Sequence, residues 1–310
     1  MGLSGVVNVG GVRIAGLSGI FNERNFRVGR HEQPPYAGNA LRSVYHVREL
    51  EVFRLQQLTG HIDVGLSHDW PRGIVQYGDA PELLERKRFL KTEVNENRLG
   101  SPPAEKLLHK LQPDYWFSAH LHCKFAAVVK HKLPREGQGR PGGKYSATTR
   151  FLALDKCLPK RDFLQLISVP RPQEGNGCEG QAVNLEYDVE WLSILKASHH
   201  LLSNTRDEVK MPAECQPVPQ AEKDWVRDQL AARGLPRGPL VIPMNFTATA
   251  PPQPKLSSKR RRASKPRQPL RPNLQTDQLL ELLELDHVVT VPCSPEHSGR
   301  GGWAQSGAAQ

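Results

Sequence analysis

Two histidines near the middle of the chain stand where they could bind a metal ion. The apolar run at 116–119 ends in His120 and His122. Such a run predicts a buried strand, so both histidines are expected at the strand's end, where a loop opens. Alternate residues of an extended segment point to one side, and neutral imidazole binds zinc, iron and manganese. The pattern therefore indicates two metal ligands; the alternative is a pair of surface or packed histidines.

A second stretch has the same form. The apolar run at 62–66 leads into His68 and Asp69, and Pro71 stops the predicted strand. If the two strands are neighbours, His68, His120 and His122 together supply three nitrogen ligands at one edge of a sheet.

The remaining elements alternate at first between strands and helices. The Gly10-Gly11 pair predicts the turn of a β-hairpin over 5–19. Further expected elements are a helix up to 58, helices over 81–93 and 101–111, strands over 125–129, 149–154 and 163–169, a strand passing into a helix at 185–192, and helices over 224–234 and 273–286. The strands after residue 124 are expected to form a second, largely antiparallel sheet.

The segment at 20–43 combines arginines with aromatic residues, among them Arg24, Arg27 and Tyr36. A loop of this length inside a compact domain is uncommon unless it has a function. Guanidinium groups bind phosphates and aromatic rings stack on bases, so the composition suits single-stranded RNA. The alternative is a solvated loop.

The positive charge of the chain comes mainly from one segment. The net charge is +10, and residues 251–272 contain eight Lys or Arg and no acid, which leaves +2 for the rest. The charge therefore does not predict a basic groove in the folded part. Within residues 247–310, which we expect to be largely disordered, a nuclear localisation signal or a nucleic-acid-binding arm is predicted at Lys259, Arg260, Arg261, Arg262, Lys265 and Arg267.

Two classes of protein are disfavoured. The five cysteines form no CxxC pair, which fits a reducing compartment better than a secreted disulfide framework. No apolar run approaches the roughly 18 residues of a membrane span. We therefore expect no membrane partner.

Eight motifs, in order along residues 1 to about 250, resemble the RNA lariat debranching enzymes of eukaryotes. They are GVRI with GLSGIF at 11–21, PPY at 34–36, YHVR at 45–48, LSHDWP at 66–71, LGSP at 99–102, YWFSAHLH at 115–122, FLALDKCLP at 151–159 and LEYD at 185–188. The resemblance implies an α/β (α+β) fold: part of a calcineurin-like metallophosphoesterase sandwich of two sheets flanked by helices. It implies three regions: residues 1–123 as the C-terminal portion of the catalytic domain, 124–246 as the family's C-terminal domain, and 247–310 as the basic tail.

The resemblance also implies a reaction, hydrolysis of the 2′–5′ phosphodiester at the branch point of intron lariats after mRNA splicing. His68, His120 and His122 would be ligands of divalent Mn, Fe or Zn, which acidify the attacking water. Residues 22–43 fall where the family holds its lariat-recognition loop. Substrate contacts are expected from Ser18, Arg24, Arg27, Tyr36, Tyr45, His46, Arg48 and Asp69. The implied partners are branched RNA and splicing-associated or nuclear import factors, and the implied location is the nucleus.

The sequence departs from the family at one point. The family's metal site also uses three N-terminal motifs, which end in His, in Gly-Asp and in Gly-Asn-His, and none of them is found before the hairpin at 5–19. We therefore name no certain catalytic residue and expect metal binding to be weak at most. Two hypotheses follow: a debranching phosphodiesterase, or an inactive isoform that acts as a branched-RNA-binding or interaction module.

Overall fold

A computed structural model describes residues 2–33, 36, 38–131, 148–170, 183–234, 238, 240–246 and 273–287. Its strands are β1 (Ser4–Val9), β2 (Val12–Leu17), β3 (Val64–Ser67), β4 (Tyr115–Ser118), β5 (Phe125–Lys130), β6 (Thr148–Ala153) and β7 (Leu185–Tyr187). Its helices are α1 (Glu23–Phe26), α2 (Ala40–Ser43), α3 (Glu49–Gln56), α4 (Ala80–Arg86), α5 (Lys91–Asn95), α6 (Pro102–Leu111), α7 (Val189–Ala197), α8 (Gln220–Ala232) and α9 (Leu274–Leu282), with 3₁₀ turns η1 (Ile74–Tyr77), η2 (Arg88–Leu90) and η3 (His199–Leu201). None of these helices has the length and apolar character needed to cross a membrane.

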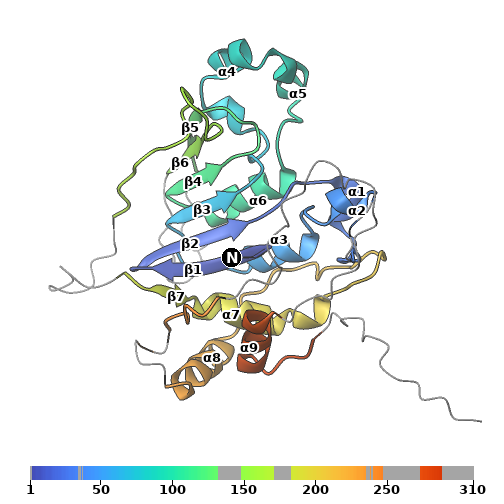
Figure 1. The fold of residues 1–310 in the computed structure, drawn as a ribbon, viewed down its shortest axis with the longest axis vertical. Helices are drawn as coiled ribbons and strands as arrows, with labels where there is room; N and C mark the ends of the chain where they lie inside the picture. The colour runs from blue at the N-terminus through green and yellow to red at the C-terminus, as the bar shows by residue number, and fades with distance from the viewer. Residues whose placement is uncertain are drawn as a thin grey trace, which may run out of the picture.

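The strands form one mixed sheet, in the order β5-β6-β4-β3-β2-β1-β7 (Figure 1). Strands β2, β3, β4 and β6 run parallel. The predicted hairpin is confirmed, since β1 and β2 pair through a turn in which Gly10 and Gly11 have φ angles of +55° and +83°. Parallel neighbours need a crossover, and α3 and α6 supply it between β2 and β3 and between β3 and β4.

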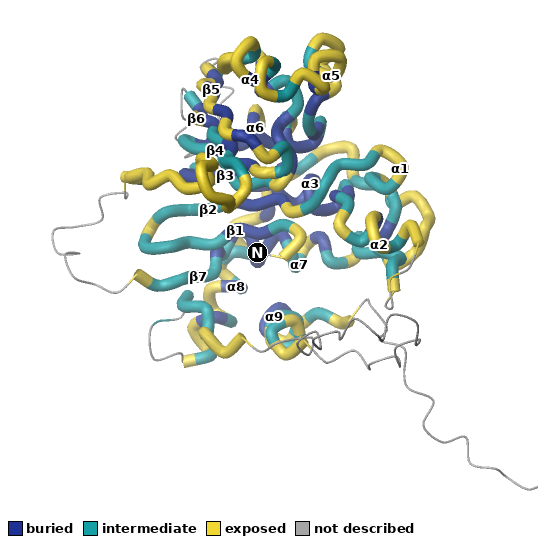
Figure 2. Tube along the Cα trace, turned by 45° about the horizontal axis from the view of Figure 1, so that its top comes forward, coloured by how far each residue is buried: buried dark blue, intermediate teal, exposed yellow. Residues whose placement is uncertain are grey.

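Helices α3 and α6 contact each other, and α3 also packs on β1 and β2. The helix expected over 101–111 is confirmed as α6: the Ser101 hydroxyl accepts the amide of Ala104 at 3.2 Å, and prolines follow in the first turn. Trp116 on β4 lies across Gly65 of β3, where a Cβ atom would come within 2.5 Å of the ring. Figure 2 shows that the buried residues concentrate in the middle of the sheet and α3, whereas α4 and α5 are largely exposed.

The C-terminal helices form a smaller core below β7. Leu192 of α7 packs with Val226 and Leu230 of α8, and with Leu282 and Leu283 at the end of α9. The helix predicted over 273–286 is confirmed as α9, which Asn273 caps by accepting the amide of Thr276 at 3.3 Å.

Three expectations about the fold need correction. The α/β class is confirmed, but the described residues form one sheet, because β6 pairs in parallel with β4 and thereby joins β5 to the first sheet. Residues 163–169 form no strand. The helix expected over 81–93 is broken at Lys87, whose φ and ψ of −133° and 60° are not helical. The boundary between residues 123 and 124 is not marked by a change of sheet, and the division into domains stays a prediction.

A buried ion network joins the hairpin to the C-terminal helices. Arg13 on β2 binds Asp188 at 2.7 Å and Glu190 at 2.8 Å, and its side chain is only 14% exposed. Glu190 also accepts from the amide of Thr59 at 3.2 Å and binds Lys223 of α8 at 2.9 Å. Asp188 caps α7 by accepting the amide of Trp191 at 2.8 Å. Four separate segments therefore meet around four charged side chains.

The network predicts that the protein loses stability in acid. Burial alone would raise the pKa of Glu190, but hydrogen bonds from Thr59, Lys223 and Arg13 outweigh it and hold the pKa at about 2, against 4.5 for a free glutamate. A lowered carboxylate pKa stabilises the fold above the unfolded pKa, and this contribution is lost as the pH falls from about 4.5 to about 2. Glu190→Gln should lower the free energy of unfolding at pH 7 by up to about 3 kcal/mol.

Urea unfolding at several pH values tests this expectation. The variant's stability should decline less than the wild type's below pH 4.5. Glu82→Gln is the matched control, because Glu82 is about half exposed and pairs with Arg86 on the same helix. Parallel pH curves for wild type and Glu190→Gln would contradict the assignment.

Candidate functional site

The histidines lie at neighbouring strand ends, as expected. His68 follows β3, His120 and His122 follow β4, and the two strands are paired in parallel. The amide of Ala119 donates to the carbonyl of His68 at 3.1 Å, which ties the two strand ends together. The rings of His68 and His120 are stacked, with centroids 5.0 Å apart and planes at 21°.

Asp69 positions His120. Its carboxylate binds Nδ1 of His120 and accepts the amide of Phe21 at 2.8 Å, and the residue is only 7% exposed. The hydrogen bond that His120 donates to the Asp69 carboxylate raises the pKa of His120 above its usual value despite partial burial. The pKa of His68 is lowered, chiefly because its imidazole is partly buried and secondly because His120 lies beside it. Asp69 was expected to contact substrate, which stays a prediction; the structure shows its contact to His120.

The backbone after β4 differs from the expectation. His120 and His122 have φ angles of +55° and +52°. These lie in the left-handed backbone region, which residues other than glycine rarely adopt. The alternation of a strand therefore does not explain how these imidazoles are placed, because the chain has left the sheet by Ala119. Non-glycine residues with positive φ concentrate at functional sites.

Among the described residues, the donor atoms of His68, His120 and His122 do not all lie within 4.8 Å of one another, so the three histidines are near neighbours and not a preformed ligand set. Because Nδ1 of His120 contacts Asp69, Nε2 is left for a metal, which is the usual arrangement of a carboxylate, a histidine and an ion. His68 and His122 are exposed, so both rings are accessible. A hollow of about 410 Å³ lies beside His68, lined also by Ser18, Ser67, Phe117 and Ser118. Ser18, an expected substrate contact, therefore faces the same space as His68.

The described part of the segment at 22–43 is a folded loop. It follows Phe21, whose amide donates to Asp69. Two backbone hydrogen bonds join this loop to the segment at 203–209. The amide of Arg30 donates to the carbonyl of Ser203 at 2.8 Å, and the amide of Val209 donates to the carbonyl of Arg27 at 2.7 Å. Arg48 binds Glu32 at 2.6 Å and is only 2% exposed. A substrate contact from Arg48 does not fit this burial; its guanidinium holds the loop from inside.

A second hollow of about 600 Å³, called the basic hollow below, lies against this loop. Its lining includes three arginines and two histidines, together with Asn, Ser, Ala and Val side chains; the arginines and histidines are Arg24, His31, Arg42, His46 and Arg206. His46 binds Asn25 through Nδ1 at 2.8 Å, and burial together with Arg48 lowers its pKa. Arg206 was not expected in a site, because nothing in its local sequence indicates that the segment at 203–209 folds against residues 22–43.

The other expected contact residues are placed as follows. Tyr36 and Tyr45 are 42% and 46% exposed. Arg27 has a side chain 67% exposed and pairs with Glu208 at 3.5 Å, so it lies beside the loop but outside the lining of the basic hollow. The predicted nuclear localisation residues at 259–267 lie outside the described residues.

Comparison with known proteins gives consistent results. Residues 146–288 match the family model described as the lariat debranching enzyme C-terminal domain. The chain is 42% identical over 280 residues to a lariat debranching enzyme of Drosophila melanogaster, and 49% identical over 212 residues to that of Homo sapiens. It is also 42% identical over 292 residues to that of Arabidopsis thaliana.

Over most of its length the chain is similar to lariat debranching enzymes, and residues 146–288 match that family's C-terminal domain. The three matches cover 81%, 68% and 93% of this chain and 51%, 37% and 62% of the Drosophila, human and Arabidopsis proteins. The chain thus spans about half the length of the curated relatives it matches. The family model begins at residue 146, so it covers β6 but neither His68 nor His120.

The contact between Asp69 and His120 predicts an effect on metal binding. Asp69→Asn should weaken Mn²⁺ binding by about 10- to 100-fold, since outer partners of metal-bound histidines contribute about this much. Isothermal titration of the metal-stripped chain measures it. Asp162→Asn, at a carboxylate 64% exposed, is the control. Equal affinity in Asp69→Asn and the wild type would show that Asp69 does not orient a ligand.

Proposed function

We propose that this chain serves in the hydrolysis of the 2′–5′ phosphodiester at the branch point of intron lariat RNA. His68, His120 and His122 are the proposed ligands of a divalent Mn, Fe or Zn ion, and the substrate is branched RNA. Such an ion, when bound, acidifies water and stabilises negative charge on phosphoryl oxygens.

One observation carries the proposal: a single carboxylate links the histidine edge to the loop. Asp69 binds His120 with one oxygen and the amide of Phe21, where the loop begins, with the other. The histidines and the basic hollow are therefore held in one connected arrangement. This geometry suits a substrate whose phosphodiester lies at the histidines while its adjoining nucleotides extend toward Arg24, Arg42 and Arg206.

The residues of the hollow would bind RNA through charge and stacking. Arginine forks bind phosphate oxygens, and an exposed ring such as that of Tyr45 can stack on a base. Tyr45 packs edge-on against His46, a lining residue of the hollow, with ring centroids 5.6 Å apart. The loop therefore provides positioning, whereas the histidine edge provides the chemistry.

The decisive experiment uses the 310-residue chain with a synthetic branched RNA, Mn²⁺ and a linear RNA of the same sequence. Cleavage that is specific to the 2′–5′ bond would establish the phosphodiesterase. Preferential binding of the branched RNA without cleavage would instead establish the interaction module. Equal, weak binding of both RNAs without cleavage would refute both.

The same binding assay tests the basic hollow. Arg206→Gln should weaken branched-RNA binding about 3- to 10-fold at low salt, because one phosphate contact is lost. For the same reason, the slope of the logarithm of the binding constant against the logarithm of the salt concentration should become shallower by about one. Arg98→Gln is the matched control, since Arg98 is 64% exposed and lies outside the hollow. Identical affinities for the two variants would remove Arg206 from the site.

We propose further that the protein acts in the nucleus, in RNA turnover after splicing. The support is the cluster of Lys259, Arg260, Arg261, Arg262, Lys265 and Arg267 in the sequence. A fluorescent fusion should accumulate in nuclei, and replacement of these six residues by Ala should make it uniform through the cell. An unchanged distribution would refute the signal.

A further inference from the structure

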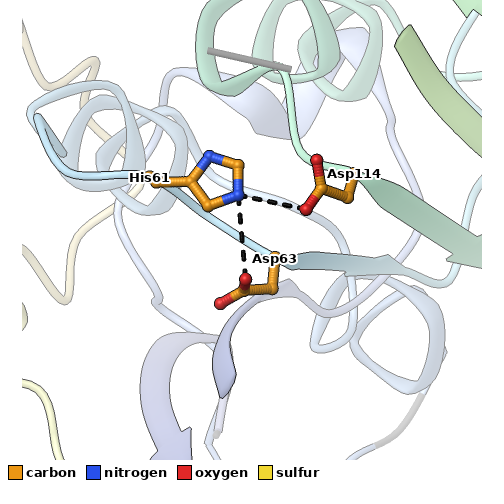
Figure 3. Close-up of side chains that lie close together, drawn as sticks. All are labelled: His61, Asp63 and Asp114. Atoms are coloured by element: carbon orange, nitrogen blue, oxygen red, sulfur yellow. Dashed lines mark hydrogen bonds and ion pairs between the residues drawn. The ribbon is translucent and has the colours of Figure 1, made fainter. Parts of the chain in front are cut away.

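A second group of possible metal ligands lies at the opposite ends of the strands that carry the histidines. His61 and Asp63 precede β3, and Asp114 precedes β4. Because β3 and β4 are parallel and pair from Val64 with Tyr115 onward, the two segments lie side by side where the strands begin. Figure 3 shows that the ring of His61 is directed toward both carboxylates. The group is therefore separate from the histidine edge.

The spacing of the three donor atoms suits a small cation. Nε2 of His61 is 3.1 Å from an oxygen of Asp114 and 3.7 Å from Oδ1 of Asp63. The three donor atoms all lie within 4.8 Å of one another. A tetrahedral ion with bonds of about 2.0–2.1 Å separates its ligand atoms by about 3.3–3.4 Å. Small side-chain rotations would bring the three atoms to that spacing.

Asp63 supplies the second observation. Its side chain is only 10% exposed, although a carboxylate so buried is normally bonded at both oxygens. Oδ2 accepts the amide of Arg13 at 2.6 Å. Oδ1 faces Nε2 of His61 at 3.7 Å, an ion-pair distance that is longer than a hydrogen bond. One oxygen is thus fixed from behind while the other is directed into the group.

We propose that His61, Asp63 and Asp114 bind a divalent first-row transition metal, with Zn²⁺ favoured. One imidazole and two carboxylates match Zn²⁺, whereas Ca²⁺ and Mg²⁺ prefer oxygen ligands alone. His61 and Asp114 are 30% and 32% exposed, which leaves an open side where solvent completes the coordination. The bound ion would clamp the starts of β3 and β4, at the far end of the strands from the histidine edge.

The test must separate this site from the histidine edge. In the 310-residue chain, stripped with chelator, Zn²⁺ binding is measured by isothermal titration in a His68→Ala, His120→Ala and His122→Ala background. One Zn²⁺ should bind, and adding His61→Asn or Asp114→Asn should weaken it at least tenfold. Ca²⁺ and Mg²⁺ should not bind. His200→Asn, at an exposed histidine elsewhere, is the matched control.

A second measurement keeps the test valid if the background variant fails to fold. In the otherwise native chain, His61→Asn with Asp114→Asn should reduce the number of bound Zn²⁺ ions by one relative to His200→Asn, and should reduce the rise in melting temperature that Zn²⁺ produces. An unchanged number of ions and an unchanged rise would overturn the site and leave the group as an ion pair. The result does not depend on RNA cleavage, so it does not bear on the proposed function.

Discussion

The ion network around Arg13 is the constraint on which the rest of the structure depends. Its guanidinium is mostly buried against Asp188 and Glu190, and Glu190 in turn binds Thr59 and Lys223. A buried charge without its partner is strongly destabilising, so each segment of the network requires the others. Gly60 fits this requirement, because a Cβ atom there would come within 2.5 Å of the Arg13 guanidinium. The hairpin, the loop before β3 and helices α7 and α8 are consequently fixed to one another.

The main-chain amide of Arg13 connects this ion network to the residues that precede β3. Arg13 donates its main-chain N–H to Asp63, which directly precedes β3. From there β2, β3 and β4 pair in parallel up to their C-terminal ends. At the C-terminal ends of β3 and β4, His68 and His120 lie side by side. Asp69 binds His120 and also accepts the amide of Phe21, where the loop begins. A chain of backbone and carboxylate contacts thus runs from the C-terminal helices to the candidate metal centre.

Several elements were predictable because their signals are local. The Gly10-Gly11 turn and the apolar runs at 62–66 and 116–119 each encode an element within a few residues. The errors concern non-local choices. The sequence of β6 does not say whether it pairs with β4 or starts another sheet, and the exposed segment at 163–169 has apolar residues yet forms no strand. Sheet partners are selected by packing across the whole chain, which no short window contains.

By itself the sequence determined the resemblance to lariat debranching enzymes, through motifs in a fixed order, and it predicted the three histidines at strand ends. Both signals are local, because strand patterns and ligand types depend on neighbouring residues in the chain. Only the tertiary structure decided what surrounds them. Arg48 was expected at the substrate and lies buried against Glu32, Asp69 orients His120, and Arg206 reaches the loop from a distant segment. The grouping of His61 with Asp63 and Asp114 likewise exists only because two strands pair in parallel. Residue type sets which chemistry is possible, whereas distances between residues remote in sequence are set by how the strands and helices pack.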